Sequence, residues 1–188
     1  MLKSELVFLE VFSGAKSQKA IAEKIGISLS TVNNAIKPLE RIGAISKKRF
    51  GFDLVDKEKA LLFWASSRNL EKDIVYKTRV QLPVSGIEGS MPSGVIFTAF
   101  TAFRLKFNEV PADYSEVYVY ANEEELSEIK KRFPPADAPP NLLVLEKPAI
   151  FFCKKVVTNE LLFVDLWNLK EWYSKEFLIA LKKKTGFE

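Results

Sequence analysis

The side chains best suited to chemistry in this sequence lie between residues 28 and 49, and their types are those that contact nucleic acids. Asparagine can bond an adenine edge through both amide atoms, hydroxyls reach bases or phosphates, and Lys or Arg reaches guanine or the backbone. The positions that the apolar residues leave free on one expected helix are Ser30, Thr31, Asn33, Asn34, Lys37 and Arg41. We expect this face to contact double-stranded DNA.

An ordinary solvated face is the alternative for the same residues. Because Ser, Thr and Asn are weak helix formers, a helix surface built from them brings no stability of its own. The composition therefore favours DNA contact. Ser17 is expected to cap the preceding helix, and Ser28 or Ser30 this one, with their hydroxyls also within reach of DNA.

The spacing of three residues predicts the element that holds this face. Within residues 16–49, Ala22, Gly26 and Val32 follow one another at offsets of four and six. In a helix-turn-helix the small residue lets two helices approach, the glycine takes the left-handed turn, and the branched residue seats the second helix on the first. Pro38 lacks an N–H to donate within that second helix, so we expect a bend there.

A hairpin is expected to follow, with strands over 44–48 and 52–55. Three cations at its tip repel one another unless an anion is present, so we expect them to bind the DNA backbone. The alternative is a hairpin whose cations are solvated and do not contact DNA. The full set of expected DNA contacts is Ser17, Ser28, Ser30, Thr31, Asn33, Asn34, Lys37, Arg41, Lys47, Lys48 and Arg49.

Charge is distributed unevenly along the chain. Residues 1–70 carry 12 Lys and Arg against 7 Asp and Glu, whereas residues 71–188 carry 16 against 17. Residues 16–49 alone hold 8 basic residues against 2 acidic ones. Such local enrichment is the electrostatic pattern of a phosphate-binding surface, although lysine-rich faces also occur in thermostable proteins.

The amino-acid composition limits which catalytic and metal sites the protein can form. The 188 residues include no histidine, the commonest metal ligand and the commonest general base at neutral pH. Zinc sites and His-dependent triads are therefore excluded, and we expect no catalytic residue, no metal and no cofactor. The single cysteine, Cys153, is expected to be a buried thiol. With no signal peptide and no membrane-length apolar run, a cytoplasmic protein is expected.

Two domains are expected from the length and the 47% hydrophobic content. Asp56 can cap a helix that ends at the polar stretch 66–69, which marks the boundary. We predict an α+β protein: a winged helix-turn-helix DNA-binding domain over residues 1–70 and a mixed α/β regulatory or partner-binding domain over residues 71–188.

Alternating helices and strands are expected in the second domain. The strands are expected at 73–82, 116–120, 142–145 and 150–153, and an extended proline-rich loop at 134–140. Ser93 is expected to cap an apolar helix that runs through Phe97 to Phe107, and Asn122 with Glu125 forms a capping box. Asp165, alone among apolar residues, is expected to accept a structural hydrogen bond from the backbone or a tryptophan.

Nucleotidyl transfer is one activity that the second half could suggest, because Gly89-Ser90 matches the Gly-Ser that such enzymes place before two metal-binding carboxylates. No Asp or Glu occurs between Glu88 and Glu109, so the metal clamp cannot be assembled locally. We therefore expect no enzyme, and at most a degenerate nucleotidyltransferase-like fold.

Two resemblances extend these inferences. The first 65 or so residues, with KSQKAIAEKIGISLSTVNNAIKPLERIGAISKKRFGFDLV, resemble a winged-helix transcription regulator. The remainder resembles the C-terminal domain of the AbiEi-like antitoxin regulators, through GVIFTAFTA at 94–102, VYVY at 117–120 and VVTNELLFVDL at 156–166.

The second resemblance implies an autorepressor that binds operator DNA beside a partner toxin with nucleotidyltransferase activity. No sequence pattern in this chain identifies such a toxin. A chromosomal regulator with the same architecture is therefore an equal alternative. A small effector and a homodimer are further expectations for the second domain. The contrasting hypothesis is a nucleotidyl-transfer or other enzyme that a winged helix targets to nucleic acid.

Overall fold

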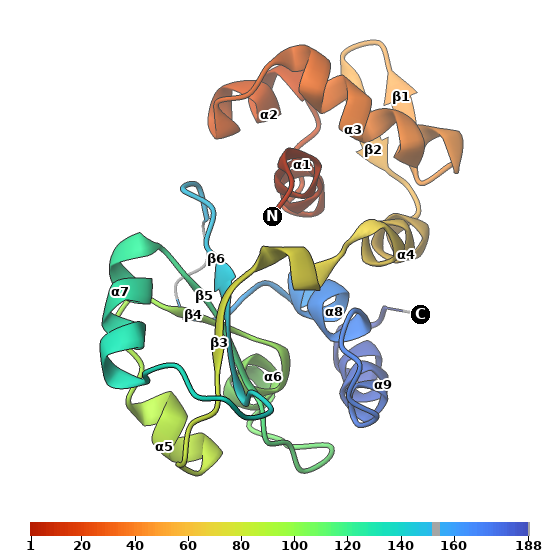
Figure 1. Cartoon of the computed structure of the whole chain (residues 1–188). Coiled ribbons are helices and arrows are strands. Elements are labelled where there is room, and N and C mark those ends of the chain that lie inside the picture. The colour runs from red at the N-terminus through yellow and green to blue at the C-terminus, as the bar shows by residue number, and fades with distance from the viewer. Residues whose placement is uncertain (152–154, 188) are drawn as a thin grey trace. The chain divides into compact units, whose positions relative to one another are not determined.

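The computed structural model describes residues 1–151 and 155–187. They form two compact units, one of residues 1–68 together with the C-terminal residues from 186, and one of residues 69–185. Figure 1 labels the helices and strands, which include two separate sheets among the described residues. Among the described residues, no helix is long and apolar enough to cross a membrane.

The first unit contains four helices and a hairpin in its described part. Their order is α1 (Lys3–Phe12), α2 (Gln18–Ile25), α3 (Leu29–Arg41), β1 (Ile45–Lys48), β2 (Gly51–Leu54) and α4 (Lys57–Ser67). Fully buried apolar side chains from α1, α2 and α3, among them Val7, Ile21 and Ile36, form its core with Trp64 of α4. The apolar faces of the helices thus meet at one centre.

The helix ends in this unit follow local signals. The Ser17 hydroxyl caps α2, and Ser28 rather than Ser30 caps α3. Gly26 ends α2 in the left-handed conformation at φ 66°, as the turn requires. Helix α3 continues through Pro38 without a break. The turn between α2 and α3 is therefore the one that the sequence predicts.

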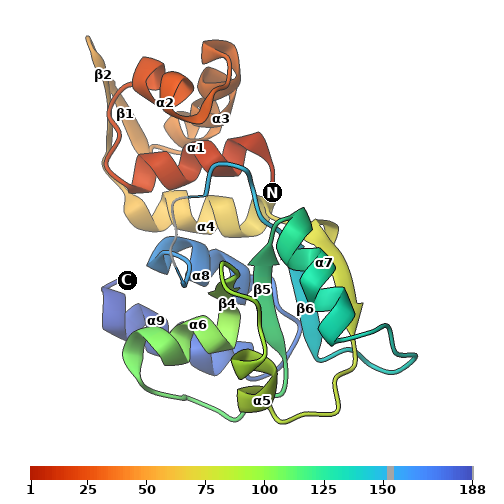
Figure 2. The ribbon, with the colours of Figure 1, turned by 90° about the vertical axis from the view of Figure 1, so that its left-hand side faces the viewer.

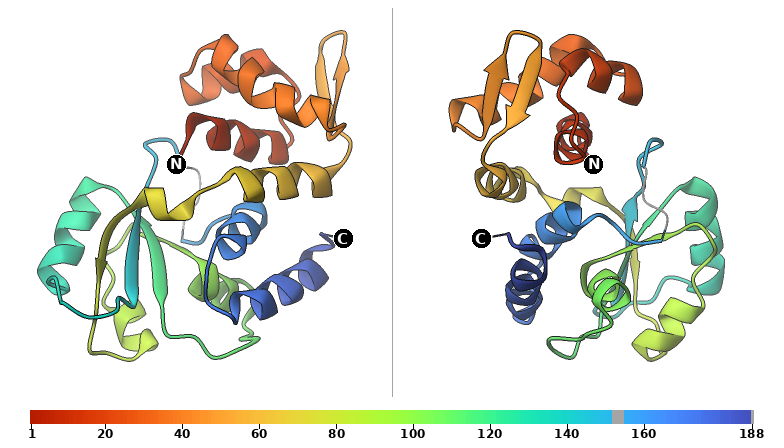
Figure 3. Two further views of the ribbon diagram at one scale, coloured as in Figure 1. Left: turned by 45° about the vertical axis from the view of Figure 1, so that its right-hand side comes forward. Right: turned by 180° about the vertical axis from the view of Figure 1, so that it is seen from behind.

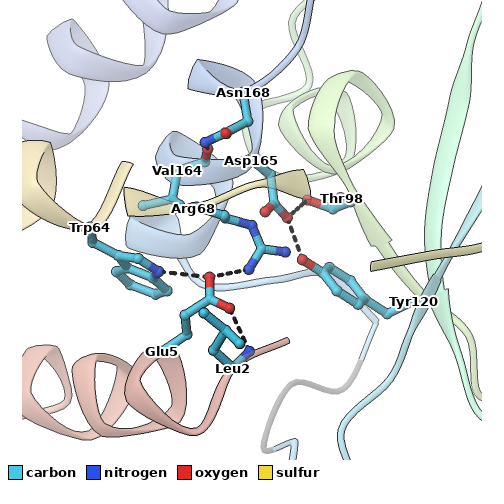
Figure 4. Close-up of polar contacts among 9 residues, drawn as sticks. All are labelled: Leu2, Glu5, Trp64, Arg68, Thr98, Tyr120, Val164, Asp165 and Asn168. Carbon is cyan, nitrogen blue, oxygen red and sulfur yellow. Dashed lines mark hydrogen bonds and ion pairs between the residues drawn. The ribbon is translucent and has the colours of Figure 1, made fainter. Parts of the chain in front are cut away.

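Two acidic residues of α1 are buried. Glu5 accepts hydrogen bonds from the Trp64 indole nitrogen at 3.1 Å and from the Arg68 guanidinium, as Figure 4 shows. Glu10 accepts one from the ammonium of Lys24 at 2.7 Å. Because buried carboxylates need such partners, these bonds tie α1 to α4 and to α2.

The second unit is built on a four-stranded mixed sheet in the order β3-β6-β5-β4. Strands β5 and β6 are parallel and the two outer pairs are antiparallel. Its elements are η1 (Leu70–Asp73), β3 (Ile74–Thr78), α5 (Val84–Gly89), β4 (Ile96–Thr98), α6 (Ala99–Phe107), β5 (Val117–Ala121), α7 (Glu123–Arg132), β6 (Leu142–Glu146), α8 (Asn159–Trp167) and α9 (Ser174–Thr185). Helix α7 covers one face, and α6, α8 and α9 cover the other (Figures 1 and 2).

The helix predicted from a Ser93 cap is wrong in its first turn. Residues 96–98 form strand β4, where Phe97 pairs with Val119. The helix begins only at Ala99, after Thr98. A short apolar run fits a buried strand as well as a buried helix, and the β-branched and aromatic residues of this run favour the strand.

Other expectations for this unit also change. Strand β5 covers Val117–Ala121, one residue later than the expected 116–120, and all five of its residues are buried between covered sheet faces. Strand β3 ends at Thr78, short of the predicted 82. Ile150 and Phe151 lie outside the strands, and the other two residues of the predicted fourth strand, 152 and 153, lie outside the described residues, so the expectation for Cys153 is not tested.

One local prediction is confirmed in the second unit, and another is corrected. Asn122 and Glu125 form the expected capping box, with both hydrogen bonds at 2.8 Å. Asp165 is buried and has a structural role, but its carboxylate accepts from hydroxyls, Thr98 at 2.6 Å and Tyr120 at 2.8 Å (Figure 4). These hydroxyl donors differ from the backbone or tryptophan donor expected from the sequence.

Candidate DNA-binding surface

Helix α3 turns its polar residues away from the core. Val32, Ala35, Ile36 and Leu39 are buried. On the other side Ser30, Asn34, Lys37 and Arg41 are exposed at steps of four, three and four, which places them along one stripe. Thr31 and Asn33 are half-buried at the edges of this stripe. One helix face thus presents all six residues that the sequence analysis proposed for this helix.

The two capping serines are part of the helix ends. The Ser28 oxygen accepts the backbone N–H of Thr31 at 3.1 Å, and the two hydroxyl oxygens lie 2.8 Å apart. The Ser17 oxygen accepts the N–H of Ala20 at 3.4 Å. These serines fix the start of each helix, where backbone N–H groups favour a phosphate.

The hairpin β1-β2 is the wing, and it projects beyond the helices of its unit (Figure 3). Its strands pair from Ile45 opposite Leu54 to Lys48 opposite Gly51, so Arg49 and Phe50 form the turn.

A neighbouring segment anchors the wing. The buried Phe52 donates its backbone N–H to the carbonyl of Lys16 at 2.9 Å. Gly51 has φ 141°, and a Cβ atom there would lie 2.0 Å from the same carbonyl oxygen. Only glycine allows so close an approach, which fixes the start of β2, next to the wing turn, beside the segment that leads into α2.

Carboxylates of the same unit already neutralise two of the three wing cations. Lys47 lies 2.7 Å from Glu40, and Lys48 forms an ion pair with Asp53. The repulsion expected among the three cations is therefore relieved in part within the protein, by carboxylates that the sequence pattern does not place near them. The hydrogen bond from Lys48 lowers the pKa of the Asp53 carboxyl below its usual value.

The remaining expected cations are more available. Lys37 and Arg41 are exposed, and among the described residues neither pairs with a carboxylate. The Arg49 guanidinium lies over the Phe50 ring, 5.1 Å from its centroid. A phosphate can approach these three cations without first displacing an internal anion.

Two exposed apolar side chains on this surface are not among the residues expected from the sequence. Phe50 at the wing turn is 85% exposed, and Leu29 in the first turn of α3 is 53% exposed. An apolar residue within a run of cations is the only signal that could have drawn attention to Phe50.

The second unit has a cavity of about 540 Å³ beside strand β3. Leu143 and Tyr118 line this cavity, and Lys170 and Glu71, 2.5 Å apart, are among its charged residues. The Tyr118 hydroxyl donates to Glu171 at 3.0 Å, and burial raises the pKa of this tyrosine. A cavity that combines apolar side chains with charged and polar groups suits a small amphipathic molecule.

Gly89-Ser90 lies at the end of α5, without a second carboxylate nearby in sequence. The adjacent Glu88 accepts hydrogen bonds from Arg104 at 2.5 Å and Thr101 at 2.8 Å, so it is engaged in the packing of α5 on α6. In residues 1–151 and 155–187, no group of three His, Cys, Asp or Glu side chains could hold a metal ion.

Comparison with known proteins identifies one domain. A family model described as winged helix-turn-helix DNA-binding matches residues 14–46, which contain α2 and α3. No curated protein and no solved structure matches the chain. The family match supports a DNA-binding regulator.

Proposed function

We propose that the protein is a sequence-specific transcription regulator that binds double-stranded DNA and acts as a repressor. The observation that carries this proposal is the exposed stripe of α3, with Asn34, Lys37 and Arg41, beside a cationic wing. A major groove about 12 Å wide admits one α-helix, and Asn, Lys and Arg are the side chains that distinguish base pairs there.

The two parts of the surface have different tasks in this proposal. Asn33, Asn34 and Lys37 reach base edges, which gives sequence preference. The wing and the helix N-termini hold phosphates, which gives affinity and orientation. Repression follows when the bound protein covers a promoter.

The test is binding to DNA duplexes selected from a random pool, measured by fluorescence anisotropy over a range of salt concentrations. If about five phosphates are neutralised, the logarithm of the association constant falls against log salt with a slope of roughly −4 to −5. A slope near zero, or no binding to duplexes at low salt, contradicts the proposal.

The second unit is proposed to regulate the first in the cytoplasm. The cavity beside β3 favours a small effector, and the AbiEi-like resemblance favours a partner toxin and autorepression. Homodimerisation through this unit would place two first units on a palindromic operator. Co-expression with a neighbouring nucleotidyltransferase gene, where one exists, tests the antitoxin role: rescue of growth supports it, and growth arrest despite expression opposes it.

An enzyme targeted to nucleic acid by the winged helix is the contrasting proposal. The engagement of Glu88 with Arg104 weighs against it, because the carboxylate nearest Gly89-Ser90 takes part in an ion pair. An assay for nucleotide transfer decides between the two.

A further inference from the structure

Phe50 occupies an unusual place for a large apolar side chain. It lies in the two-residue turn of the wing and is 85% exposed, whereas Phe52, two residues later, is 2% exposed. One phenylalanine thus anchors the hairpin in the core and the other stands at its tip. Single exposed apolar residues are common on protein surfaces. A functional role for Phe50 must therefore be argued from the residues around it.

The support beneath Phe50 is stiff. The backbone N–H of Phe52 donates to the Lys16 carbonyl at 2.9 Å, and Gly51 fits against that carbonyl where no Cβ could. The ion pair between Lys47 and Glu40 ties β1 to α3 at 2.7 Å. The wing tip therefore presents its ring from a defined position relative to α3, as a residue that inserts into a ligand requires.

One cation lies over the ring, and others precede Phe50 in the chain. The Arg49 guanidinium lies 5.1 Å from the ring centroid, and Lys48 precedes it in β1. A matching ligand combines an anionic edge with an apolar, aromatic interior. Duplex DNA has this combination, since phosphates border each groove and stacked bases lie between them. Apolar side chains such as Phe insert between base steps in this way, and aromatic rings stack on bases.

The position of the wing indicates the groove. Strand β1 follows α3 directly, and the hairpin projects to the side of that helix (Figure 3). If α3 occupies the major groove, the groove across the adjacent phosphate strand is the minor groove. We propose that Phe50 inserts from the minor groove between two stacked base pairs, unstacks that step and bends the DNA away from the wing. This inference rests on the proposed function.

Arg49 changes its contact when Phe50 inserts. On insertion the ring leaves water and contacts bases, and the guanidinium moves from the ring to a bordering phosphate. Pyrimidine–purine steps unstack most easily. The wing would therefore prefer a step such as TA beside the sequence that α3 contacts, which adds sequence preference without a hydrogen bond to a base.

The experiment uses the full chain and a selected duplex in which 2-aminopurine replaces adenine at one position at a time. This base fluoresces more strongly when it is unstacked. With the wild-type protein bound, we expect a fluorescence increase of at least twofold at one step beside the α3 site. Phe50→Ala is expected to abolish the increase, and Phe50→Leu, which keeps an apolar wedge, is expected to retain most of it.

Val55→Ala is the matched control, because Val55 is 60% exposed on the same unit but lies after the wing rather than at its tip. It should leave the fluorescence unchanged. Stacking on one aromatic ring corresponds to roughly 5- to 150-fold in affinity, partly offset by the cost of unstacking, so we expect Phe50→Ala to weaken binding by about 5- to 10-fold.

Two negative results have different meanings. Saturated complexes in which no position gains fluorescence, or in which Phe50→Ala gives the same increase as the wild type, overturn the insertion of Phe50 and leave the DNA-binding function intact. Failure of the wild-type protein to bind any selected duplex at low salt overturns the proposed function itself, and the insertion with it.

Discussion

The ammonium group of Lys47 lies 2.7 Å from the carboxylate of Glu40, which joins the first strand of the wing to the last turn of α3. The two side chains are 48% and 36% exposed. Water therefore screens the pair, and its strength is that of a surface ion pair, ~0.2–1 kcal/mol. A DNA phosphate that binds Lys47 must compete with Glu40.

Glu40→Gln is expected to strengthen DNA binding. Release of Lys47 from an ion pair of this strength raises the affinity by roughly 1.5- to 5-fold, and the salt dependence steepens by up to about 0.9 in slope. Anisotropy titrations at several salt concentrations measure both quantities. Glu58→Gln is the control, because it removes the same charge from α4, outside the α3 face and the wing. An equal gain in DNA affinity from this variant would contradict a specific role of Glu40.

Substitutions on α3 and on the wing are expected to differ in their effect on specificity. Alanine at Asn33, Asn34 or Lys37 should cost ~1–3 kcal/mol on the preferred duplex and less on random DNA. Alanine at Lys47, Lys48 or Arg49 should weaken binding to both duplexes alike, because phosphates carry no sequence. Parallel titrations with both duplexes measure the difference; equal losses for all six variants would refute this division of labour.

Gly51→Ala is expected to destabilise the wing. The added Cβ would lie 2.0 Å from the carbonyl oxygen of Lys16, and φ 141° is strained for any L side chain. Strain of this kind costs ~1–3 kcal/mol, and the clash adds to it. Urea unfolding measures the loss.

Gly14→Ala is the control for backbone strain. Gly14 has φ 93°, but a Cβ there would have no atom within 4 Å. We expect Gly51→Ala to lose more stability than Gly14→Ala, and also to lose DNA affinity. Equal losses in both variants would show that the contact with Lys16 contributes nothing.

The sequence predicts those parts of the fold that depend on residues close to one another in the chain. Ser17, Ser28, Asp56 and Asn122 cap helices as expected, since a cap needs only an N–H three residues ahead. The left-handed Gly26 is equally local. The polar stripe of α3 follows from helical spacing alone, which is why its residues share one face.

The sequence does not reveal contacts between distant residues. Glu5 accepts hydrogen bonds from Trp64 and Arg68, which lie 59 and 63 residues later in the chain. Nothing in the sequence near Glu5 indicates these donors. The pairing that makes residues 96–98 a strand also depends on β5, about twenty residues later in the chain. The anchoring of Gly51 on Lys16 belongs to the same class, because it exists only when the wing has folded back on the start of α2.

The second unit is expected to fold by itself and to lack both DNA affinity and catalysis. Residues 69–185 form a compact unit with a buried core, and residues 71–188 carry 16 basic against 17 acidic residues, which gives no attraction for phosphates. A fragment of residues 69–185 should show a cooperative urea transition and no binding to the duplex that the full chain selects. Neither it nor the full chain should transfer nucleotides from any triphosphate with magnesium or manganese. Metal-dependent transfer that persists through purification and is lost in Glu88→Gln would instead make the winged helix a targeting device for an enzyme.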